Sequence, residues 1–294
     1  FTIMSRPVAT TNADVYYMTY NDHHYISAGF QVNACKSVRK LAQTVFCSGE
    51  LLWTLGRKRV TVEEDHRIGN LGFLARKFHA VLHFLRTRKT HHSIMHNPVV
   101  CFLDGFDVIN IRPLHDFKDN FDRMWRNLQL PDESGASAPP MAIFNRERPG
   151  DGKVNTGVYC GYAEDIERLL SMIEEYFFES NASQKLTDQM MMNSRYFDDP
   201  VRYRVAIDTN GTLFEKGLRV KMPYDPPICP VRALEKRGEN QEEYPQHMET
   251  GARPYFVHYA GRMHKHAGRL CEIQSCSNRA YWVYDTDHKE MVQC

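Results

Sequence analysis

The sequence predicts an α/β fold in which a mixed sheet carries helices on both faces. Short apolar runs that end at turns alternate with longer segments of helical periodicity, as expected when helices connect the strands of one sheet. The run at residues 98–103 is apolar almost throughout, which is typical of a central strand. The length of 294 residues, with 42% hydrophobic and 25% charged, suits one large globular unit.

The strands and helices follow each other along the chain. Strands are predicted at residues 15–19, 98–103, 141–144, 205–208 and 255–258, from short apolar or β-branched runs bounded by turns. Helices are predicted at residues 28–43, 71–88, 163–178 and 186–196. The third of these helices is the clearest, because its core positions keep the i, i+3, i+4, i+7 spacing: Ile166, Leu169, Leu170 and Ile173.

The segments between these elements differ in composition. Residues 131–140 are rich in Ser, Ala, Gly and Pro and are expected to form a mobile loop. Residues 224–252 are dominated by Pro, Glu, Arg and Gln and are expected to be an exposed excursion. The Met190–Met192 run is interpreted as buried packing, since methionine fills irregular gaps. Residues 1–270 are expected to form a single domain and residues 271–294 a C-terminal extension.

Composition excludes some functions and leaves the compartment open. The 37 basic and 36 acidic residues nearly cancel, so no global charge favours nucleic acid, although a local basic groove stays open. No apolar run approaches the length needed to span a bilayer. The eight cysteines contain no Cys-x-x-Cys pair, so a structural zinc site is not expected and disulfide pairing stays undecided. Sequons at Asn181 and Asn210 favour a secretory compartment, the lumen of the endoplasmic reticulum or Golgi.

Two predicted strands end in side chains that suit a divalent cation. Asp104 and Asp107 flank a tight turn at Gly105, and His258 ends the last predicted strand. Ligands of open α/β sheets bind beyond the carboxyl ends of strands, and two carboxylates with one imidazole suit manganese or a similar ion. The alternative interpretation is an ordinary Asp-Gly turn and a hydrogen-bonded structural histidine.

Five segments in the same order resemble the glycosyltransferase domain of the procollagen lysyl hydroxylase family, across roughly residues 70 to 265. Residues 99–109 are similar to its Asp-x-x-Asp segment, and residues 154–163 to its Asn-Ser-Gly-Gly segment. Residues 187–189 are similar to its Asp-Asp-Gln segment, residues 208–214 to a Leu-Asp and Ile-Phe strand pair, and residues 258–261 to its His-Gly-Asn-Gly turn. The resemblance implies a GT-A fold, a Rossmann-like mixed sheet with helices on both faces.

The resemblance also implies roles for individual residues. Manganese would be held by Asp104, Asp107 and His258, and Asp188 would contact the transferred sugar or act as the catalytic base. The remaining residues implied to bind the UDP-sugar donor, including those that follow the first strand, are Thr19, Asn21, Lys77, Asn155, Thr156, Gly157, Gly261 and Lys265. Simpler interpretations stay open beside these, namely a solvated helix lysine for Lys77 and a plain turn for Thr19 and Asn21.

The sequence departs from the family at several positions. Thr187 replaces the first acidic residue of Asp-Asp-Gln, Tyr259 replaces a glycine, and Lys265 lies one residue later than the family's lysine. The first 70 residues match poorly, and no hydroxylase domain is recognisable in the sequence. These differences indicate a divergent relative.

The expected reaction moves glucose or galactose from a UDP-sugar to a hydroxyl group, with manganese as cofactor. The acceptor is expected to resemble hydroxylysine or to be another hydroxylated protein, glycan or nucleobase. The sequence does not decide between inverting and retaining chemistry. Two alternatives remain, a non-catalytic module that binds a glycan or partner, and a metal-dependent nucleotide-sugar hydrolase or pyrophosphorylase.

Overall fold

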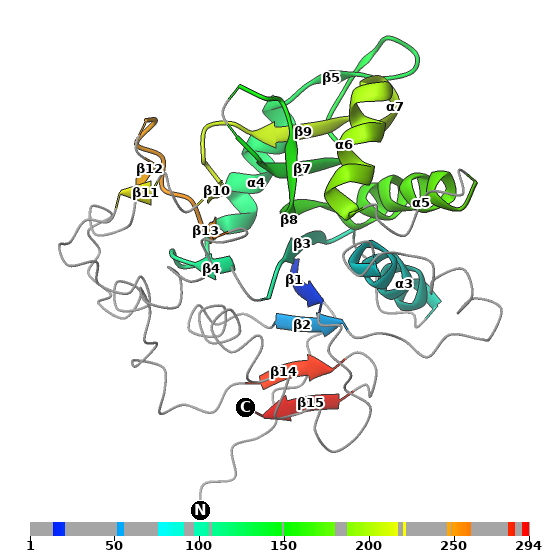
Figure 1. Cartoon of the computed structure of the whole chain (residues 1–294). Helices are drawn as coiled ribbons and strands as arrows, with labels where there is room; N and C mark the ends of the chain where they lie inside the picture. Colours follow the sequence, from blue (N-terminus) through cyan, green and yellow to red (C-terminus); the bar gives the residue numbers. More distant parts are fainter. Residues whose placement is uncertain are drawn as a thin grey trace, which may run out of the picture.

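The computed structural model describes residues 14–20, 52–55, 76–90, 97–105, 108–148, 150–179, 187–216, 220–221, 246–247, 249–259, 282–285 and 290–293. An eight-stranded sheet in the order β15-β14-β2-β1-β3-β8-β7-β9 forms its centre (Figure 1). Its strands are β1 (Val15–Tyr20), β2 (Leu52–Leu55), β3 (Val99–Leu103), β7 (Ala142–Arg146), β8 (Val154–Tyr162), β9 (Val205–Asp208), β14 (Trp282–Asp285) and β15 (Glu290–Gln293). The predicted mixed α/β sheet is confirmed.

Strand directions in this sheet decide where a site can form. β1, β2, β3 and β14 run parallel, and β7 and β9 run parallel to each other. β8 lies between β3 and β7 and is antiparallel to both. The N-terminal half of β8 therefore lies at the edge of the sheet where β3 and β7 end. Ligands of α/β sheets bind at this edge.

Three smaller sheets accompany the main one. β4 (Val108–Asn110), β13 (Phe256–His258) and β10 (Phe214–Lys216) form a three-stranded sheet in which β13 is central. β11 (Val220–Lys221) pairs with β12 (Gln246–His247), and β5 (Leu130–Pro131) pairs with β6 (Ser137–Ala138). The parallel pairing of β10 with β13 places Lys216 opposite His258.

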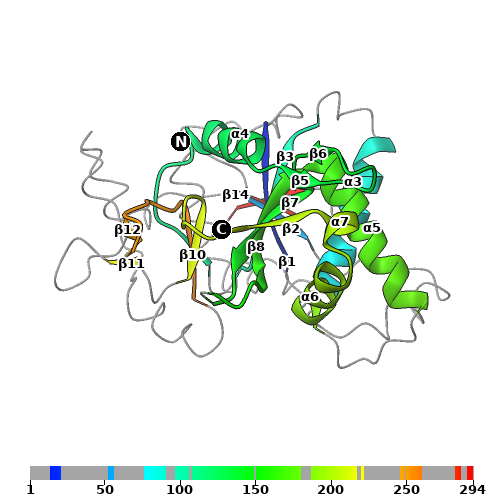
Figure 2. The ribbon, with the colours of Figure 1, turned by 90° about the horizontal axis from the view of Figure 1, so that it is seen from above.

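Helices cover both faces of the main sheet (Figure 2). α3 (Arg76–Thr90), α5 (Ala163–Glu179) and α6 (Asp188–Asp198) lie on one face, and the short α7 (Pro200–Tyr203) follows α6. α4 (Phe117–Asn127) lies on the other face, beside the three-stranded sheet. No helix among the described residues is long and apolar enough to cross a membrane.

The strand residues alternate between two hydrophobic cores. Val100 and Phe102 of β3 pack with the α3, α5 and α6 side, whereas Val99, Cys101 and Leu103 pack with the α4 side. The predicted core stripe of α5 is confirmed, because Ile166, Leu169, Leu170 and Ile173 are all at most 1% exposed. Both faces of β3 are thus buried, which explains its continuous apolar sequence.

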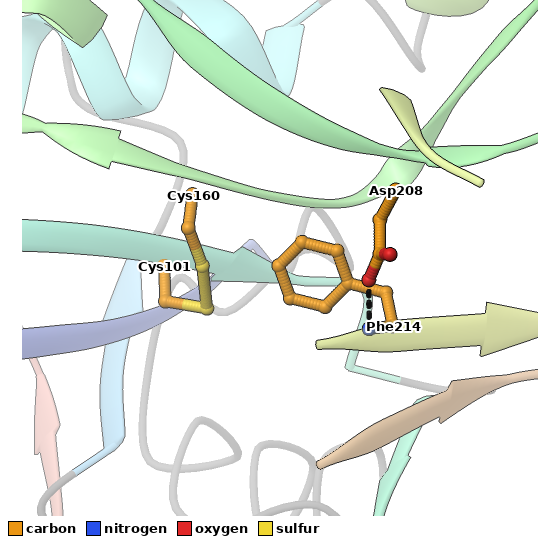
Figure 3. Close-up of a disulfide and its surroundings, with 4 residues drawn as sticks. All are labelled: Cys101, Cys160, Asp208 and Phe214. Carbon is orange, nitrogen blue, oxygen red and sulfur yellow. Dashed lines mark hydrogen bonds between the residues drawn. A yellow bond between two sulfur atoms is a disulfide. The ribbon is translucent and has the colours of Figure 1, made fainter. Parts of the chain in front are cut away.

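Cys101 and Cys160 form a disulfide between β3 and β8 (Figure 3). The two residues are direct partners in the antiparallel register, with Cα atoms 4.2 Å apart. The bond lies in the fully buried α4-side core. The sequence left this pairing undecided, since the two cysteines are 59 residues apart.

Asp208 fixes the connection from the main sheet to the three-stranded sheet. Its carboxylate accepts backbone hydrogen bonds from Thr212, Leu213 and Phe214, the last at 3.0 Å (Figure 3). Burial raises the pKa of Asp208 above its usual value, although the three backbone donors act in the opposite direction. The contacts hold the turn between β9 and β10 and so position the strand beside β13.

Several sequence predictions need revision or lie outside the described residues. Most of residues 131–140, expected as a mobile loop, belong to the β5–β6 hairpin, whose turn is held because Asp132 accepts hydrogen bonds from the backbone of Ser134 and Ala136. The predicted helix at residues 28–43 lies outside the described residues, as does most of the excursion at 224–252. Residues 282–285 and 290–293, within the segment expected as a C-terminal extension, form β14 and β15 at the edge of the main sheet.

Candidate active site

A pocket of about 670 Å³ opens at the carboxyl-terminal edge of β3. Three groups of residues line it: the start of β8, one face of α6 with its N-cap, and single side chains from α3, the end of β3 and β13. They are Lys77, Asp104, Lys153, Asn155, Thr156, Gly157, Thr187, Asp188, Gln189, Met190, Asn193, Phe197 and His258. Seven of these residues were predicted from the sequence as site residues.

Asp104 and His258 face each other across the inner end of this pocket. The Oδ2 atom of Asp104 lies 3.9 Å from Nε2 of His258. The backbone holds Asp104 beside β8, because its N–H donates to the carbonyl of Gly157 at 2.8 Å. The side chain of His258 is only 4% exposed, whereas that of Asp104 is 30% exposed. A buried imidazole therefore faces a carboxylate that is open to the pocket.

Lys77 bridges the two carboxylates of the pocket. Its Nζ atom lies 2.7 Å from Oδ2 of Asp188 and 3.1 Å from Oδ1 of Asp104. Burial lowers the pKa of Lys77, but the charges of Asp104 and Asp188 outweigh burial and raise it above its usual value. The interpretation of Lys77 as a solvated helix lysine is wrong, since it is buried over the ring of Phe102. It is a permanent ammonium between two acidic groups.

Asp188 lies at the first position of α6, with its carboxylate turned into the pocket. Thr187 caps the helix, since its Oγ1 accepts from the backbone N–H of Met190 at 3.1 Å. The hydroxyl of Thr156 donates to Asp188 as well. A carboxylate at a helix N-terminus is stabilised by the helix dipole. Thr187, which replaces an acidic residue of the resembling family, thus acts as the helix cap.

The start of β8 packs closely against His258. A Cβ atom added at Gly157 would lie 2.1 Å from Cε1 of the imidazole, so only glycine fits here. The side chain of Asn155 accepts from Nδ1 of His258 at 2.7 Å and from the N–H of Gly157 at 3.0 Å. Asn193 holds this segment to α6 by bonding both backbone groups of Val154. Three consecutive residues of β8 thus form the floor of the pocket.

The outer end of the pocket follows one face of α6. Met190, Asn193 and Phe197 have the i, i+3, i+7 spacing of a helical stripe. The interpretation of Met190–Met192 as buried packing holds for Met191 and Met192 but is wrong for Met190, which is 53% exposed. Phe197 is 49% exposed. The spacing of this stripe was visible in the sequence, but the face it would present was not.

The other sequence-predicted residues lie elsewhere. Thr19 is buried within β1 and is not among the residues that line the pocket. Four predicted residues fall outside the described part of the chain: Asn21, Asp107, Gly261 and Lys265. Within the described part, no group of three or more His, Cys, Asp or Glu side chains is arranged to hold a metal ion. Of the three predicted metal ligands, Asp104 and His258 lie in the described part of the chain and Asp107 lies outside it.

Comparisons with known proteins give similar folds and no sequence family. No protein-family model matches the chain, and no curated protein matches it. Similar solved structures include glycosyltransferases. One acts in glycosylation of the major capsid of PBCV-1 (14% identity, TM-score 0.43, 87% of this chain and 100% of that one). Others are the galactosyltransferase LgtC (13%, 0.42, 88% and 97%) and GlyE of Streptococcus pneumoniae (11%, 0.41, 85% and 55%). These TM-scores lie below 0.5, so they assign no activity to this chain.

Proposed function

We propose that this chain is a glycosyltransferase that transfers a sugar from a nucleotide-sugar to an acceptor hydroxyl, with a divalent cation held by Asp104 and His258. One observation carries the proposal. Two residues far apart in sequence face each other at 3.9 Å in a pocket that also holds Lys77 and Asp188. The donor expected from the sequence resemblance is UDP-glucose or UDP-galactose.

The two described ligands fit a divalent cation. Metal bonds to histidine nitrogen and carboxylate oxygen are about 2.0–2.2 Å long, so one ion can join two such atoms up to about 4.3 Å apart. The observed separation of 3.9 Å lies within that reach. When bound, such a cation would supply positive charge to offset the charge that develops on a leaving diphosphate. Asp107, the third proposed ligand, lies outside the described residues.

The charges of the inner pocket support a site for a cation and a phosphate together. Within the ion-paired group of Asp104, Lys77 and Asp188, two carboxylates outnumber one ammonium, which leaves one net negative charge on this group. Lys153 also lines the pocket but is not part of this group. That negative charge attracts a cation. The ammonium of Lys77 can then stabilise the negative charge that develops on a phosphate oxygen of the leaving group. Asp188 is the proposed base in an inverting reaction, since its carboxylate lies at the pocket surface beside Thr156.

The acceptor is proposed to lie along α6, at the outer end of the pocket. Phe197 follows Asp188 by nine residues (197 − 188), which is about 13 Å along a helix at 1.5 Å per residue. That length leaves room for an acceptor ring beyond the donor sugar. The exposed side chains of Met190 and Phe197 offer an apolar face for it. Phe197→Ala should raise the acceptor KM and leave acceptor-free donor hydrolysis unchanged, whereas Phe197→Tyr should keep both.

A secretory compartment is part of the proposal. The Cys101–Cys160 disulfide supports it, because disulfides persist in oxidising compartments. Asn210, which begins a sequon, is exposed on the turn after β9 and is open to glycosylation.

The test is a screen of UDP-sugars for manganese-dependent turnover without acceptor. The wild-type chain should release sugar slowly only with the metal, and Asp104→Asn should reduce this at least tenfold. Asp119→Asn, on the exposed face of α4, is the matched control and should behave as wild type. Full activity of Asp104→Asn, or equal activity after chelation, would overturn the proposal. Analysis of products formed with acceptor present separates transfer from simple hydrolysis or pyrophosphorolysis.

A non-catalytic binding module is the second candidate, and the position of Lys77 favours it. The ammonium lies between both carboxylates, at 2.7 and 3.1 Å, and holds them together without a metal. Titration of UDP with and without manganese discriminates the two. A binding module should bind with an affinity independent of the metal and show no turnover with any UDP-sugar.

A further inference from the structure

Asn155 uses every hydrogen-bonding position of its side chain. Its Oδ1 atom accepts from Nδ1 of His258 at 2.7 Å and from the backbone N–H of Gly157 at 3.0 Å. Its Nδ2 atom donates to Oε2 of Glu147 at 2.7 Å and to Oε1 of Gln189 at 3.3 Å. A carboxamide offers two donors and two acceptor lone pairs, so this buried side chain is fully satisfied.

The partners of Asn155 determine which way its amide points. Burial raises the pKa of Glu147, but hydrogen bonds from Asn155 and Lys216 and the charge of Lys216 outweigh burial and lower it. Glu147 is therefore an ionised carboxylate, which can only accept hydrogen bonds. The backbone N–H of Gly157 can only donate. The amide nitrogen must therefore face Glu147 and the oxygen must face Gly157. The same oxygen faces His258, so Nδ1 of His258 must carry the proton in this contact.

The tautomer of His258 follows from this contact. A neutral imidazole carries one proton, so a ring protonated at Nδ1 has its acceptor lone pair at Nε2. Nε2 is the atom that lies 3.9 Å from Oδ2 of Asp104. A neutral histidine side chain in water favours the opposite tautomer, with the proton on Nε2. The protein must therefore enforce the form that the contact requires.

A closed ring of contacts holds Asn155 and His258 in place. The Nζ atom of Lys216 donates to Oε1 of Glu147 at 3.0 Å and to its backbone carbonyl at 3.0 Å. Lys216 is also the register partner of His258 across the β10–β13 pair. The chain of contacts runs from Lys216 through Glu147 and Asn155 to His258 and returns through the strand pair. Gly157 closes the remaining side of the imidazole ring.

We propose that Asn155 is a positioning residue that holds His258 in the Nδ1–H tautomer and so presents Nε2 as an electron-pair donor toward Asp104 and a divalent cation. The tautomer itself needs no metal, and only the consequence for the cation rests on the proposed function. Partners that orient a metal-binding histidine typically change metal affinity 10–100-fold when they are removed. In this role Asn155 acts through His258.

The first test reads the tautomer directly in the full chain without metal. Long-range ¹H–¹⁵N correlation spectra, at a pH where the ring is neutral, distinguish protonated from unprotonated ring nitrogens, and comparison with His258→Gln assigns the signal. His258 should carry its proton on Nδ1. A proton on Nε2 in the wild-type chain would overturn the proposal, and this measurement needs no variant at Asn155.

The second test removes and then restores the acceptor. Asn155→Leu should shift His258 toward the Nε2–H tautomer and weaken manganese binding 10–100-fold, measured by electron paramagnetic resonance. The combined variant Asn155→Asp with Glu147→Gln keeps an oxygen toward Nδ1 and reverses the donor and acceptor toward residue 147, so it should restore both readouts. Asn127→Leu, on the exposed end of α4, is the matched control and should change neither.

The outcomes separate the two proposals. A tautomer that shifts in Asn155→Leu while the wild-type chain binds no manganese supports the positioning role and overturns the metal-dependent function. A tautomer and a manganese affinity that both stay unchanged in a folded Asn155→Leu variant overturn the positioning role alone. Loss of thermal stability without a tautomer change would assign Asn155 a purely structural role and would likewise overturn it.

Discussion

A methyl group added at Gly157 would collide with the imidazole of His258. The hydrogen of its Cα faces the His258 ring, and an added Cβ would lie 2.1 Å from Cε1 and 2.7 Å from both ring nitrogens. The imidazole cannot simply move aside, because Asn155 holds its Nδ1. The absence of a side chain at this position is what allows the His258 ring to pack against β8.

Gly157→Ala should therefore displace the imidazole and weaken manganese binding at least tenfold. Forcing one extra carbon into a packed site typically costs about 1–3 kcal/mol of stability. Chemical denaturation and manganese titration measure the two effects. A double-mutant cycle with His258→Ala is the control, because the stability cost of Gly157→Ala should largely vanish once the ring is absent. Unchanged manganese affinity in the single variant would contradict the prediction.

Tyr159 carries a buried hydroxyl beneath the two carboxylates of the pocket. Its ring stacks on Phe102 and Phe144, with centroids 5.2 and 4.9 Å away. Among the described residues, the hydroxyl has no hydrogen-bond partner. Burial, then the charges of Asp188 and Asp104, raise the pKa of Tyr159 well above its usual value, so the phenol stays neutral.

Tyr159→Phe should leave the free energy of unfolding unchanged or raise it by up to about 1 kcal/mol. An unpaired buried hydroxyl costs free energy, and phenylalanine keeps the stacked ring. Urea denaturation of the two proteins measures the difference. A loss above about 1 kcal/mol would show that the hydroxyl has a partner, contrary to the prediction.

Helix α6 serves the site through both its end and its face. Its first turn places Asp188 in the pocket, and the stripe of Met190, Asn193 and Phe197 extends the wall outward. Asn193 ties the helix to Val154 of β8 by two hydrogen bonds. The helix is thus fixed at its start by a cap and along its length by a side-chain contact with the sheet.

Thr187→Ala should destabilise the protein by about 1 kcal/mol, because the N–H of Met190 loses its side-chain acceptor. Thr187→Asp should recover most of this loss, since aspartate is an equally good N-cap. Thermal and urea unfolding measure both variants. Equal stability of Thr187→Ala and the wild type would show that the cap contributes nothing to α6.

At the scale of the whole molecule, charged side chains join the main sheet to the smaller sheets. Glu147 follows β7 and pairs with Lys216 at the end of β10, with a separation of 3.0 Å. A buried cluster nearby joins Arg146 of β7 to Glu215 of β10 and His247 of β12. Because β13 lies beside β10, these links decide how His258 lies relative to Asp104.

Glu147→Gln should lower stability by about 1 kcal/mol or less at neutral pH, since the pair is partly exposed and screened. The lowered pKa of Glu147 means that its contribution is present above its unfolded pKa of about 4.3 and is lost as pH falls through the folded value. The stability difference between wild type and variant should therefore shrink below about pH 4. Urea denaturation at stepped pH measures it, and a difference that grows on acidification would reverse the predicted sign.

Periodicity and composition predicted the regular elements that have strong local signals. The strand predicted at residues 98–103 and the helix predicted at 163–178 are present as β3 and α5. A continuous apolar run is buried well as a central strand, and an apolar stripe of helical spacing is buried well as a helix. β8 was not predicted as a strand. Its nine residues include two glycines and two polar residues, and its stabilising contacts, above all the pairing with β3 and β7, come from segments remote in sequence. α4 was missed because its buried positions are few, Phe117 and Phe121.

The sequence by itself determined the mixed α/β class and predicted seven of the residues that line the pocket, since an apolar run followed by Asp104 and a strand ending in His258 are local patterns. Tertiary structure decided how those residues lie. The antiparallel position of β8 in the sheet places Asn155 and Gly157 beside His258. The packing of α3 buries Lys77, which pairs with the carboxylates of Asp104 and Asp188. The physical reason is that distances and charges between residues remote in sequence depend on strand order and register, which no local pattern encodes.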